Sequence, residues 1–310
     1  MPKLIVLSDP VYLLHDPGPW HPESPARLTA VQKAIDSIKN IELITTSRPA
    51  RLDELHLVHT AKYIDYVMSL PDDHPVQLDP DTLMSLYSKE AALKAAGGVI
   101  DITEMVMAGK NIRAFCAVRP PGHHAMPDRA MGFCIFNNVA IAAAWALDKK
   151  GLERIAIMDW DLHHGNGTEA VFYNSEKALY ISTHQSPFYP GTGDSLDTGT
   201  GAGTGFNINI PMAAAAGDDQ FQEAFEGIIL PALNNYKPQL IFISAGFDAH
   251  RNDPLGGLKL STEFFGQMTR WLSEVADKYS DGRIVSVLEG GYNLTAIEET
   301  VKIHLEELKN

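Results

Sequence analysis

The stretch Ile155-Ala-Ile-Met-Asp159-Trp-Asp161-Leu-His163-His164-Gly-Asn166-Gly-Thr168 decides how the fold is interpreted, because an apolar run stops abruptly at residues that bind metals or move protons. A short apolar run bounded by polar residues is typical of a buried strand. Side chains of an extended chain alternate between faces, so Asp159, Asp161 and His163 point the same way as far as the strand persists. The segment predicts a strand that delivers a metal site. Taken alone, it also fits a polar loop with capping roles.

The rest of the chain alternates between strand-like and helix-like segments. Nearly continuous apolar runs, as in buried parallel strands, lie at 4–7, 112–118, 154–158, 178–182, 206–210, 240–244 and 284–288. Segments with a helical pattern lie at 25–39, 88–108, 138–149, 218–234, 262–279 and 294–308. Ser24-Pro25 and Ser261-Thr262 are typical helix starts. This alternation predicts an α/β fold with a parallel sheet covered by helices on both faces.

Length and composition favour one domain spanning residues 1–310. The chain has 310 residues and 45% hydrophobic content, enough for a large core, and no Pro/Gly/Ser-rich linker divides it. Its first residues resemble a strand rather than a signal peptide, and no apolar run approaches the ~20 residues that span a membrane. We therefore expect a cytoplasmic protein without a membrane partner.

Charge and cysteine content exclude other classes. The formal net charge of −14 argues against a nucleic-acid partner, because duplex binding needs clustered Lys and Arg. Only Cys116 and Cys134 are present, which is too few for a disulfide framework or a cysteine-rich metal site. Both are expected to be buried thiols.

Four predicted strands end in glycine and reactive side chains. The run at 112–118 leads into Arg119-Pro-Pro-Gly-His123-His124, and the run at 240–244 leads into Ala245-Gly-Phe-Asp248-Ala-His250. The run at 284–288 leads into Glu289-Gly-Gly-Tyr292, and the fourth ending is the Asp/His cluster quoted above. In parallel α/β sheets, sites form at the carboxyl ends of strands, so these endings are expected to meet.

The combined endings supply the parts of a metal-dependent hydrolase. Asp248 is the natural third ligand beside Asp161 and His163, because a catalytic zinc normally takes three protein ligands and leaves one position open. Oxygen-plus-nitrogen ligation suits Zn²⁺ or Fe²⁺ better than Ca²⁺ or Mg²⁺. A histidine of the His123-His124 pair would take a proton from the attacking water, and a phenol donor would stabilise the oxyanion.

The four motifs R-P-P-G-H-H, D-W-D-L-H-H-G-N-G-T, S-A-G-F-D-A-H and L-E-G-G-Y-N occur in this order along nearly the whole chain. Together they resemble the zinc-dependent histone deacetylase family, with its bacterial relatives the acetylpolyamine amidohydrolases and acetoin-utilisation proteins. The segment from His21 to Leu28 and the loop from Tyr189 to Gly193 extend the likeness. Asn166 and Glu289 place the chain nearer the class II branch. The resemblance implies the arginase/deacetylase fold, a single domain with a mostly parallel eight-stranded sheet.

Carried over by position, the resemblance implies one Zn²⁺ per chain, held by Asp161, His163 and Asp248. Fe²⁺ would fit the same two-carboxylate, one-imidazole set. The family also binds a structural K⁺ through main-chain oxygens of Asp159, Asp161 and His163 together with Ser182. Backbone carbonyls carry no residue signature, so the K⁺ site rests on the resemblance alone.

The catalytic residues follow from the same resemblance. His124 would be the general base and then the acid for the leaving amine, and His123 would assist electrostatically with Asp159 as its partner. Asn166 would orient His124, and its neutral amide leaves less stabilisation for the imidazolium than an aspartate would. Tyr292 would donate to the amide oxygen as it becomes an oxyanion.

A narrow tunnel for an aliphatic chain is implied by aromatic residues that flank the site in relatives. Tyr189 stands where many relatives have Phe, so its hydroxyl would admit a polar contact. Asp81 falls where relatives place an aspartate that accepts backbone N–H groups of a peptide, although Asp79-Pro-Asp81-Thr also fits a simple turn. The residues expected to contact substrate are Gly132, Phe133, Tyr189, Leu255, Asp81, Gly290 and Gly291.

Removal of an acetyl or other acyl group from a primary amine is the predicted reaction, with two substrates left open. Polyamine-selective members of the family carry an acidic gatekeeper residue at the rim of the tunnel. Leu255, the apolar residue expected at that position here, favours ε-acetyl-lysine of a protein or peptide. Acetylated putrescine, cadaverine or spermidine is the alternative, since the loop at 14–20 carries His15, Asp16 and Trp20 and would provide an acidic rim. An arginase-like enzyme with two Mn²⁺ and an inactive binding module are the rival classes. A homo-oligomer is compatible with every one of these interpretations.

Overall fold

The computed structural model describes residues 2–310, which fold around an eight-stranded sheet. The strand order is β2-β1-β5-β10-β9-β6-β7-β8, and every neighbouring pair is parallel. The bounds are Glu42–Ile44 (β2), Lys3–Leu7 (β1), Ile112–Cys116 (β5), Ile284–Leu288 (β10), Leu240–Ala245 (β9), Ile155–Asp159 (β6), Ala178–Gln185 (β7) and Asn207–Met212 (β8). This confirms the predicted single α/β domain.

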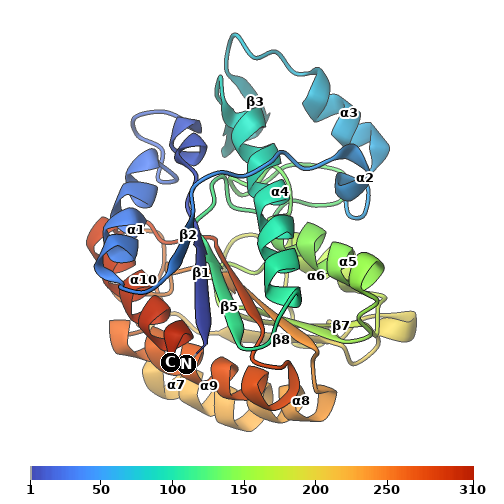
Figure 1. Cartoon of the computed structure of the whole chain (residues 1–310), viewed down its shortest axis with the longest axis vertical. Helices are drawn as coiled ribbons and strands as arrows, with labels where there is room; N and C mark the ends of the chain where they lie inside the picture. Colours follow the sequence, from blue (N-terminus) through green and yellow to red (C-terminus); the bar gives the residue numbers. More distant parts are fainter. Residues whose placement is uncertain (1) are drawn as a thin grey trace.

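Helices cover both faces of the sheet (Figure 1). One face carries α4 (Ser88–Met107), α5 (Asn138–Lys150) and α6 (Asn166–Phe172). The other carries α1 (Pro25–Ser37), α9 (Thr262–Tyr279) and α10 (Leu294–Lys309). Both faces of the central strands are therefore buried, which explains why their sequences are continuous apolar runs instead of alternating ones.

The predicted helix at 218–234 is one continuous helical segment with a wider turn inside it. It consists of α7 (Asp218–Ala224), the π-helical turn η3 (Phe225–Ile229) and α8 (Leu230–Tyr236). Both predicted helix starts are confirmed, because α1 begins at Pro25 and α9 begins at Thr262. The Ser261 side chain accepts a hydrogen bond from Phe264 N at 3.2 Å, and α9 begins at the next residue.

Short elements stand outside these layers. The 3-10 helices are η1 (Pro10–Leu14) and η2 (Gly201–Gly203), and α2 (Leu52–Leu55) and α3 (Ala61–Ser69) lie near the β3–β4 hairpin in Figure 1. That hairpin is antiparallel, with β3 at Val76–Asp79 and β4 at Thr82–Met84. Asp81 lies in its turn, as the turn interpretation of Asp79-Pro-Asp81-Thr predicts. No helix within residues 2–310 combines the length and hydropathy of a membrane span.

The carboxyl ends of the central strands lie at one edge of the sheet. Asp159, the last residue of β6, is in register with Ser182 of β7 on one side and Ser244 of β9 on the other. Leu288 ends β10 opposite Ala245 of β9. The four reactive segments that the sequence places after strands therefore begin at neighbouring points of this edge.

Candidate active site

The Asp161, His163 and Asp248 side chains form a buried cluster beyond this edge. One ligand atom of each lies within 4.8 Å of the others, and this is the metal-type cluster found within residues 2–310. Strand alternation does not produce it, because β6 ends at Asp159. Instead, Asp159 Oδ1 accepts from Asp161 N at 3.2 Å and Asp161 Oδ1 accepts from His163 N at 2.8 Å. The residues that cap the strand end are thus also residues of the metal-type cluster.

The donor set of this cluster fits a tetrahedral metal ion. His163 Nδ1 lies 3.1 Å from both Asp161 Oδ1 and Asp248 Oδ2. Ligand bonds of about 2 Å to zinc put neighbouring ligand atoms about 3.3 Å apart in a tetrahedron. Burial lowers the pKa of His163, but its bonds to the two carboxylates outweigh this and raise it to about 10. The cluster therefore attracts positive charge, which a divalent cation would supply.

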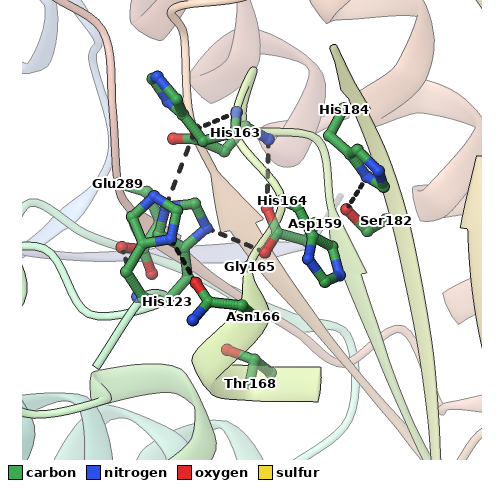
Figure 2. Close-up of polar contacts among 12 residues, drawn as sticks. His123, Asp159, His163, His164, Gly165, Asn166, Thr168, Ser182, His184 and Glu289 are labelled. Atoms are coloured by element: carbon green, nitrogen blue, oxygen red, sulfur yellow. Dashed lines mark hydrogen bonds and ion pairs between the residues drawn. The ribbon is translucent and has the colours of Figure 1, made fainter. Parts of the chain in front are cut away.

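The His123 and Asp159 side chains form a buried pair next to the cluster. His123 Nδ1 lies 3.1 Å from Asp159 Oδ2, and both side chains are almost completely buried (Figure 2). Burial lowers the pKa of His123, but the nearby carboxylates of Asp161 and Asp159 raise it to about 10. The pair therefore holds an imidazolium, the electrostatic role predicted for His123.

The neighbouring His124 has the opposite character. Burial, and then the positive charges of His123 and His163, hold its pKa well below the ordinary value for histidine. Its Nδ1 lies 2.7 Å from the Asn166 amide oxygen. His124 is therefore neutral, with Nε2 as the nitrogen left to accept a proton. Two adjacent histidines whose pKa values are pushed apart can divide the roles of electrostatic stabiliser and base.

A network of backbone contacts fixes the turn that carries Tyr292. Tyr292 N donates to Asp253 Oδ2 at 2.7 Å, and Leu255 N donates to Asp253 Oδ1 at 2.9 Å. Arg27 donates to the main-chain oxygens of Glu289 and Gly291, and its guanidinium lies 4.9 Å from the centre of the Tyr292 ring. Burial raises the pKa of Tyr292 well above its ordinary value, so the phenol stays protonated as a donor.

The glycines of this turn pack against the metal-type cluster. Gly290 N donates to Asp161 Oδ2 at 2.8 Å, and a Cβ at Gly290 would overlap the Asp248 carboxylate. Gly291 approaches Phe247 and takes φ +121°, where other residues are strained. The structure therefore explains both glycines through close packing. Their direct contact with substrate stays a prediction.

The cavity of about 90 Å³ above the cluster brings most of the predicted substrate residues together. Its lining consists of Asp81, His124, Gly132, Phe133, His163, Tyr189, Leu255 and Tyr292. The Phe133 and Tyr292 rings meet edge to face at 6.0 Å, and the Tyr189 and His124 rings meet at 5.2 Å. These contacts leave a narrow, aromatic passage to buried polar groups, as binding of a thin aliphatic chain requires.

The loop at 14–20 differs from the expected acidic rim. His15 is buried, with Nδ1 2.6 Å from Ser88 Oγ and Nε2 3.3 Å from Glu23 Oε2, so it does not face the cavity. Asp16 is exposed, but its carboxylate accepts from Gly18 N at 3.0 Å within the same loop. The expectation that His15 lies at the mouth was wrong, because its ring is buried in contact with Ser88 and Glu23.

Tyr180 and Glu289 support the site in ways that the sequence did not predict. Tyr180 Oη donates to Asp159 Oδ2 at 3.2 Å and to Gly165 O at 3.1 Å, so it shares the carboxylate oxygen that faces His123. Glu289 Oε2 accepts from Gly122 N at 2.7 Å and from His123 N at 3.2 Å. A tyrosine inside the buried run at 178–182 was the available signal for the first. Glu289 was noted only as a mark of the class II branch.

The loop that carries Tyr189 rests on buried histidines. His184 bonds Ser182 Oγ at 2.9 Å (Figure 2) and Gly193 O at 3.0 Å. His164 Nδ1 lies 2.8 Å from Thr192 Oγ1. Both histidine rings are buried, so these contacts anchor the wall of the cavity.

Comparison with known proteins gives a consistent result. The family model described as "Histone deacetylase domain" matches residues 21–308. A probable deacetylase of Archaeoglobus fulgidus is 43% identical over 91% of this chain and 79% of its own length. A histone deacetylase-like amidohydrolase of Pseudomonas aeruginosa is 39% identical over 88% of this chain and 72% of its own. The crystal structure of the HDA15 HD domain superimposes with a TM-score of 0.93 at 35% identity, covering 99% of this chain and 90% of that one.

Proposed function

Because this chain belongs to the histone deacetylase family, and is thus a hydrolase acting on amides, we propose that it removes an acetyl group from ε-acetyl-lysine in a protein or peptide. The observation that carries this proposal is one cavity in which neutral His124, Tyr292 and the metal-type cluster face a passage lined by Phe133 and Tyr189. We take the whole chain, residues 1–310, as one catalytic domain.

The proposed mechanism divides the work among the buried side chains. A metal ion held by Asp161, His163 and Asp248 would polarise the substrate carbonyl and lower the pKa of the attacking water. His124 Nε2 takes the proton of that water and later returns it to the leaving amine. His123, kept positive by Asp159, offsets the negative charge that develops. Tyr292 donates its hydroxyl to the developing oxyanion.

Zn²⁺ is the metal we propose for this site, and Fe²⁺ fits the same donor set. One ion per chain is expected, because the ligand-type side chains within residues 2–310 form one such cluster. A structural K⁺ near Asp159 and Ser182 remains part of the proposal by family likeness. An arginase-like site with two Mn²⁺ would need further carboxylate ligands and would leave Tyr292 without a role.

A lysine substrate is favoured over a polyamine by the character of the mouth. Leu255 is apolar and lines the cavity, and His15 is turned away from it. Asp81 Oδ1 accepts from Gly132 N at 3.1 Å and from Thr82 Oγ1 at 2.9 Å, so part of the one carboxylate in the lining is already satisfied. A polycationic substrate would gain little from such a rim.

The test is a side-by-side assay of the Zn²⁺-loaded enzyme on an acetyl-lysine peptide and on acetylated putrescine, cadaverine and spermidine. Tyr292→Phe serves as the blank. We expect kcat/KM to be at least about tenfold higher for the peptide, a difference of about 1.4 kcal/mol in transition-state binding. The reverse preference would make acetylpolyamines the substrate. Activity on none of them would refute acetyl removal from these amines and would point to another acyl group or another amine.

A further inference from the structure

The Asn166 side chain lies between the proposed base and two methionines. Its amide oxygen faces His124 Nδ1 at 2.7 Å (Figure 2). Its amide nitrogen lies 3.1 Å from Met126 Sδ and 3.4 Å from Met131 Sδ. Asn166 is 8% exposed, so water does not compete strongly for these contacts. Both ends of the amide are therefore held by side chains.

The methionine thioethers determine which end of the Asn166 amide faces them and which end faces His124. A methionine sulfur accepts hydrogen bonds weakly and has no hydrogen to donate. Two sulfurs on one side of Asn166 therefore favour its NH₂ group there and place the carbonyl oxygen against His124. A carbonyl oxygen can only accept, so His124 Nδ1 must carry the hydrogen. His124 Nε2 then keeps its lone pair.

From this arrangement we infer that Met126 and Met131 are positioning residues, which fix the Asn166 amide and through it the tautomer of His124. The inference rests on the proposed role of His124 as general base. With the amide rotated by half a turn, NH₂ would face the imidazole, and Nδ1 would become the acceptor. The proton would then sit on Nε2, and His124 could no longer take one from water.

Backbone hydrogen bonds fix the segment that carries both methionines. Met126 N donates to Arg129 O at 2.9 Å, and Met126 O accepts from His59 Nδ1 at 3.0 Å. Met131 N donates to Cys134 O at 3.2 Å, and Cys134 N donates to Met131 O at 2.9 Å. The short segment between His124 and Gly132 is thus pinned at two points, with a methionine at each.

An amide differs here from a carboxylate. An aspartate at this position has two acceptor oxygens and needs no support to select one tautomer of the histidine, whereas asparagine has one acceptor end and one donor end. The two sulfurs therefore matter only with asparagine, because only the amide has two unlike ends whose orientation selects the tautomer of His124. This difference allows the inference to be tested separately from ordinary packing.

The kinetic experiment is a double-mutant cycle. Met126→Leu and Met131→Leu are combined, first with Asn166 present and then in an Asn166→Asp background. Leucine conserves volume and removes the acceptor, so packing should change little. With Asn166 we expect kcat to fall about fivefold or more with KM unchanged, as expected for losing weak neutral hydrogen bonds. In the Asn166→Asp background the same leucines should cost less than about twofold.

A packing role alone would give equal losses in both backgrounds, and that result would overturn the inference, as would unchanged kcat with Asn166 present. The matched control is Met268→Leu at a buried methionine of α9, which should leave kcat as it is. Metal content and melting temperature of each variant show whether a loss reflects damage to the fold.

A second readout does not depend on turnover. In protein with ¹⁵N-labelled histidine, two-bond ¹H–¹⁵N correlations report which ring nitrogen of His124 is protonated, and His124→Ala assigns the signals. We expect Nδ1–H in the wild type and a mixture of tautomers in the double leucine variant. An identical single tautomer in both proteins would refute the inference. An inactive wild type with the expected tautomer shift would instead refute the proposed function.

Discussion

At the scale of single residues, the site places two histidines in different electrostatic environments. His123 and His124 are adjacent in sequence, and their ring centres are 4.0 Å apart. His123 faces the Asp159 carboxylate and His124 faces the Asn166 amide. A carboxylate partner favours the charged ring, whereas a neutral amide beside a positive neighbour favours the uncharged one. The pair therefore contains one charged ring and one neutral ring, which suits the proposed division into electrostatic stabiliser and base.

The Tyr292 hydroxyl is expected to act in the transition state alone. Tyr292→Phe should keep its metal and its KM and lose at least about a hundredfold in kcat, by analogy with the ~2.7–4 kcal/mol of other oxyanion-hole donors. Steady-state kinetics with metal analysis of the same sample provide the measurement. The ring would still lie against Arg27 and Phe133, so turnover near the wild-type value would remove Tyr292 from the mechanism.

Asn166 is expected to tune the basicity of His124. Asn166→Asp places a negative charge at the Nδ1 hydrogen bond, which favours the imidazolium and raises the pKa of His124. Because only neutral His124 accepts a proton, the acidic limb of the kcat/KM profile should move to higher pH by about 1 pH unit or more. The profile between pH 5 and 9 measures this. Asn174→Asp, which adds the same charge at an exposed position, should leave the limb where it is.

At the scale of helices and strands, the apolar pattern predicted most of the fold. The seven runs identified from the sequence correspond to β1 and to β5 to β10. The sequence pattern missed the β3–β4 hairpin and one strand of the main sheet, β2 (Glu42–Ile44). β2 is three residues long, lies at the sheet edge and is only partly buried. Its Glu-Leu-Ile sequence gives no pattern strong enough to distinguish a strand from a loop, because parallel pairing with β1 stabilises it from outside.

Site residues that follow a strand could be predicted from the sequence, whereas supporting residues from other segments of the chain could not. Asp161, His163 and Asp248 were identified because they follow buried strands directly. Asp253, Tyr180 and Arg27 support the site through contacts that join distant parts of the chain. The spacing of residues along the chain does not predict such contacts. The position of His15 was predicted wrongly for the same reason, since Ser88 and Glu23 bind it from other segments.

His304 links α10 to the elements beneath it and should make them sensitive to acid. Its Nδ1 lies 2.6 Å from Thr269 Oγ1 of α9, and its Nε2 lies 2.8 Å from Ser286 Oγ of β10. Thr269 Oγ1 already donates to Phe265 O at 2.7 Å, so it accepts from Nδ1. Ser286 then donates to Nε2, which needs the neutral ring. Burial without a counter-charge lowers the pKa of His304 to about 3.

The sign of the pH effect follows from this lowered pKa. In the unfolded chain the histidine binds a proton near pH 6.5, whereas in the folded chain it does so only near pH 3. Its contribution to stability is therefore complete above pH 6.5 and is lost as the pH falls, at about 1 kcal/mol per pH unit.

Urea unfolding of wild type and His304→Gln between pH 4 and 8 measures this contribution. The two free energies of unfolding should converge towards acid, whereas exposed His56→Gln should follow the wild type. Parallel curves for His304→Gln would contradict the assignment.

At the scale of the whole molecule, the metal-type cluster joins strands that are far apart in the sequence. Asp161 and His163 follow β6, Asp248 follows β9, and Gly290 after β10 donates to Asp161. An ion bound there would join the ends of β6 and β9 directly, and the end of β10 through the Gly290–Asp161 hydrogen bond, in the folded state only, because the unfolded chain does not bring the ligands close. Metal binding should therefore stabilise the entire domain.

Metal loading provides a test of both stoichiometry and stability. We expect one Zn²⁺ per chain and a melting temperature raised by about 5 °C or more when free metal exceeds its Kd about a thousandfold. Asp248→Asn should bind weakly and lose most of this increase, whereas Asp73→Asn, at an exposed carboxylate, should behave as the wild type. Two ions per chain would favour the arginase-like alternative. A melting temperature that does not respond to metal would mean that the cluster is a hydrogen-bonded turn, because an ion that joins the ends of β6 and β9 cannot leave global stability unchanged.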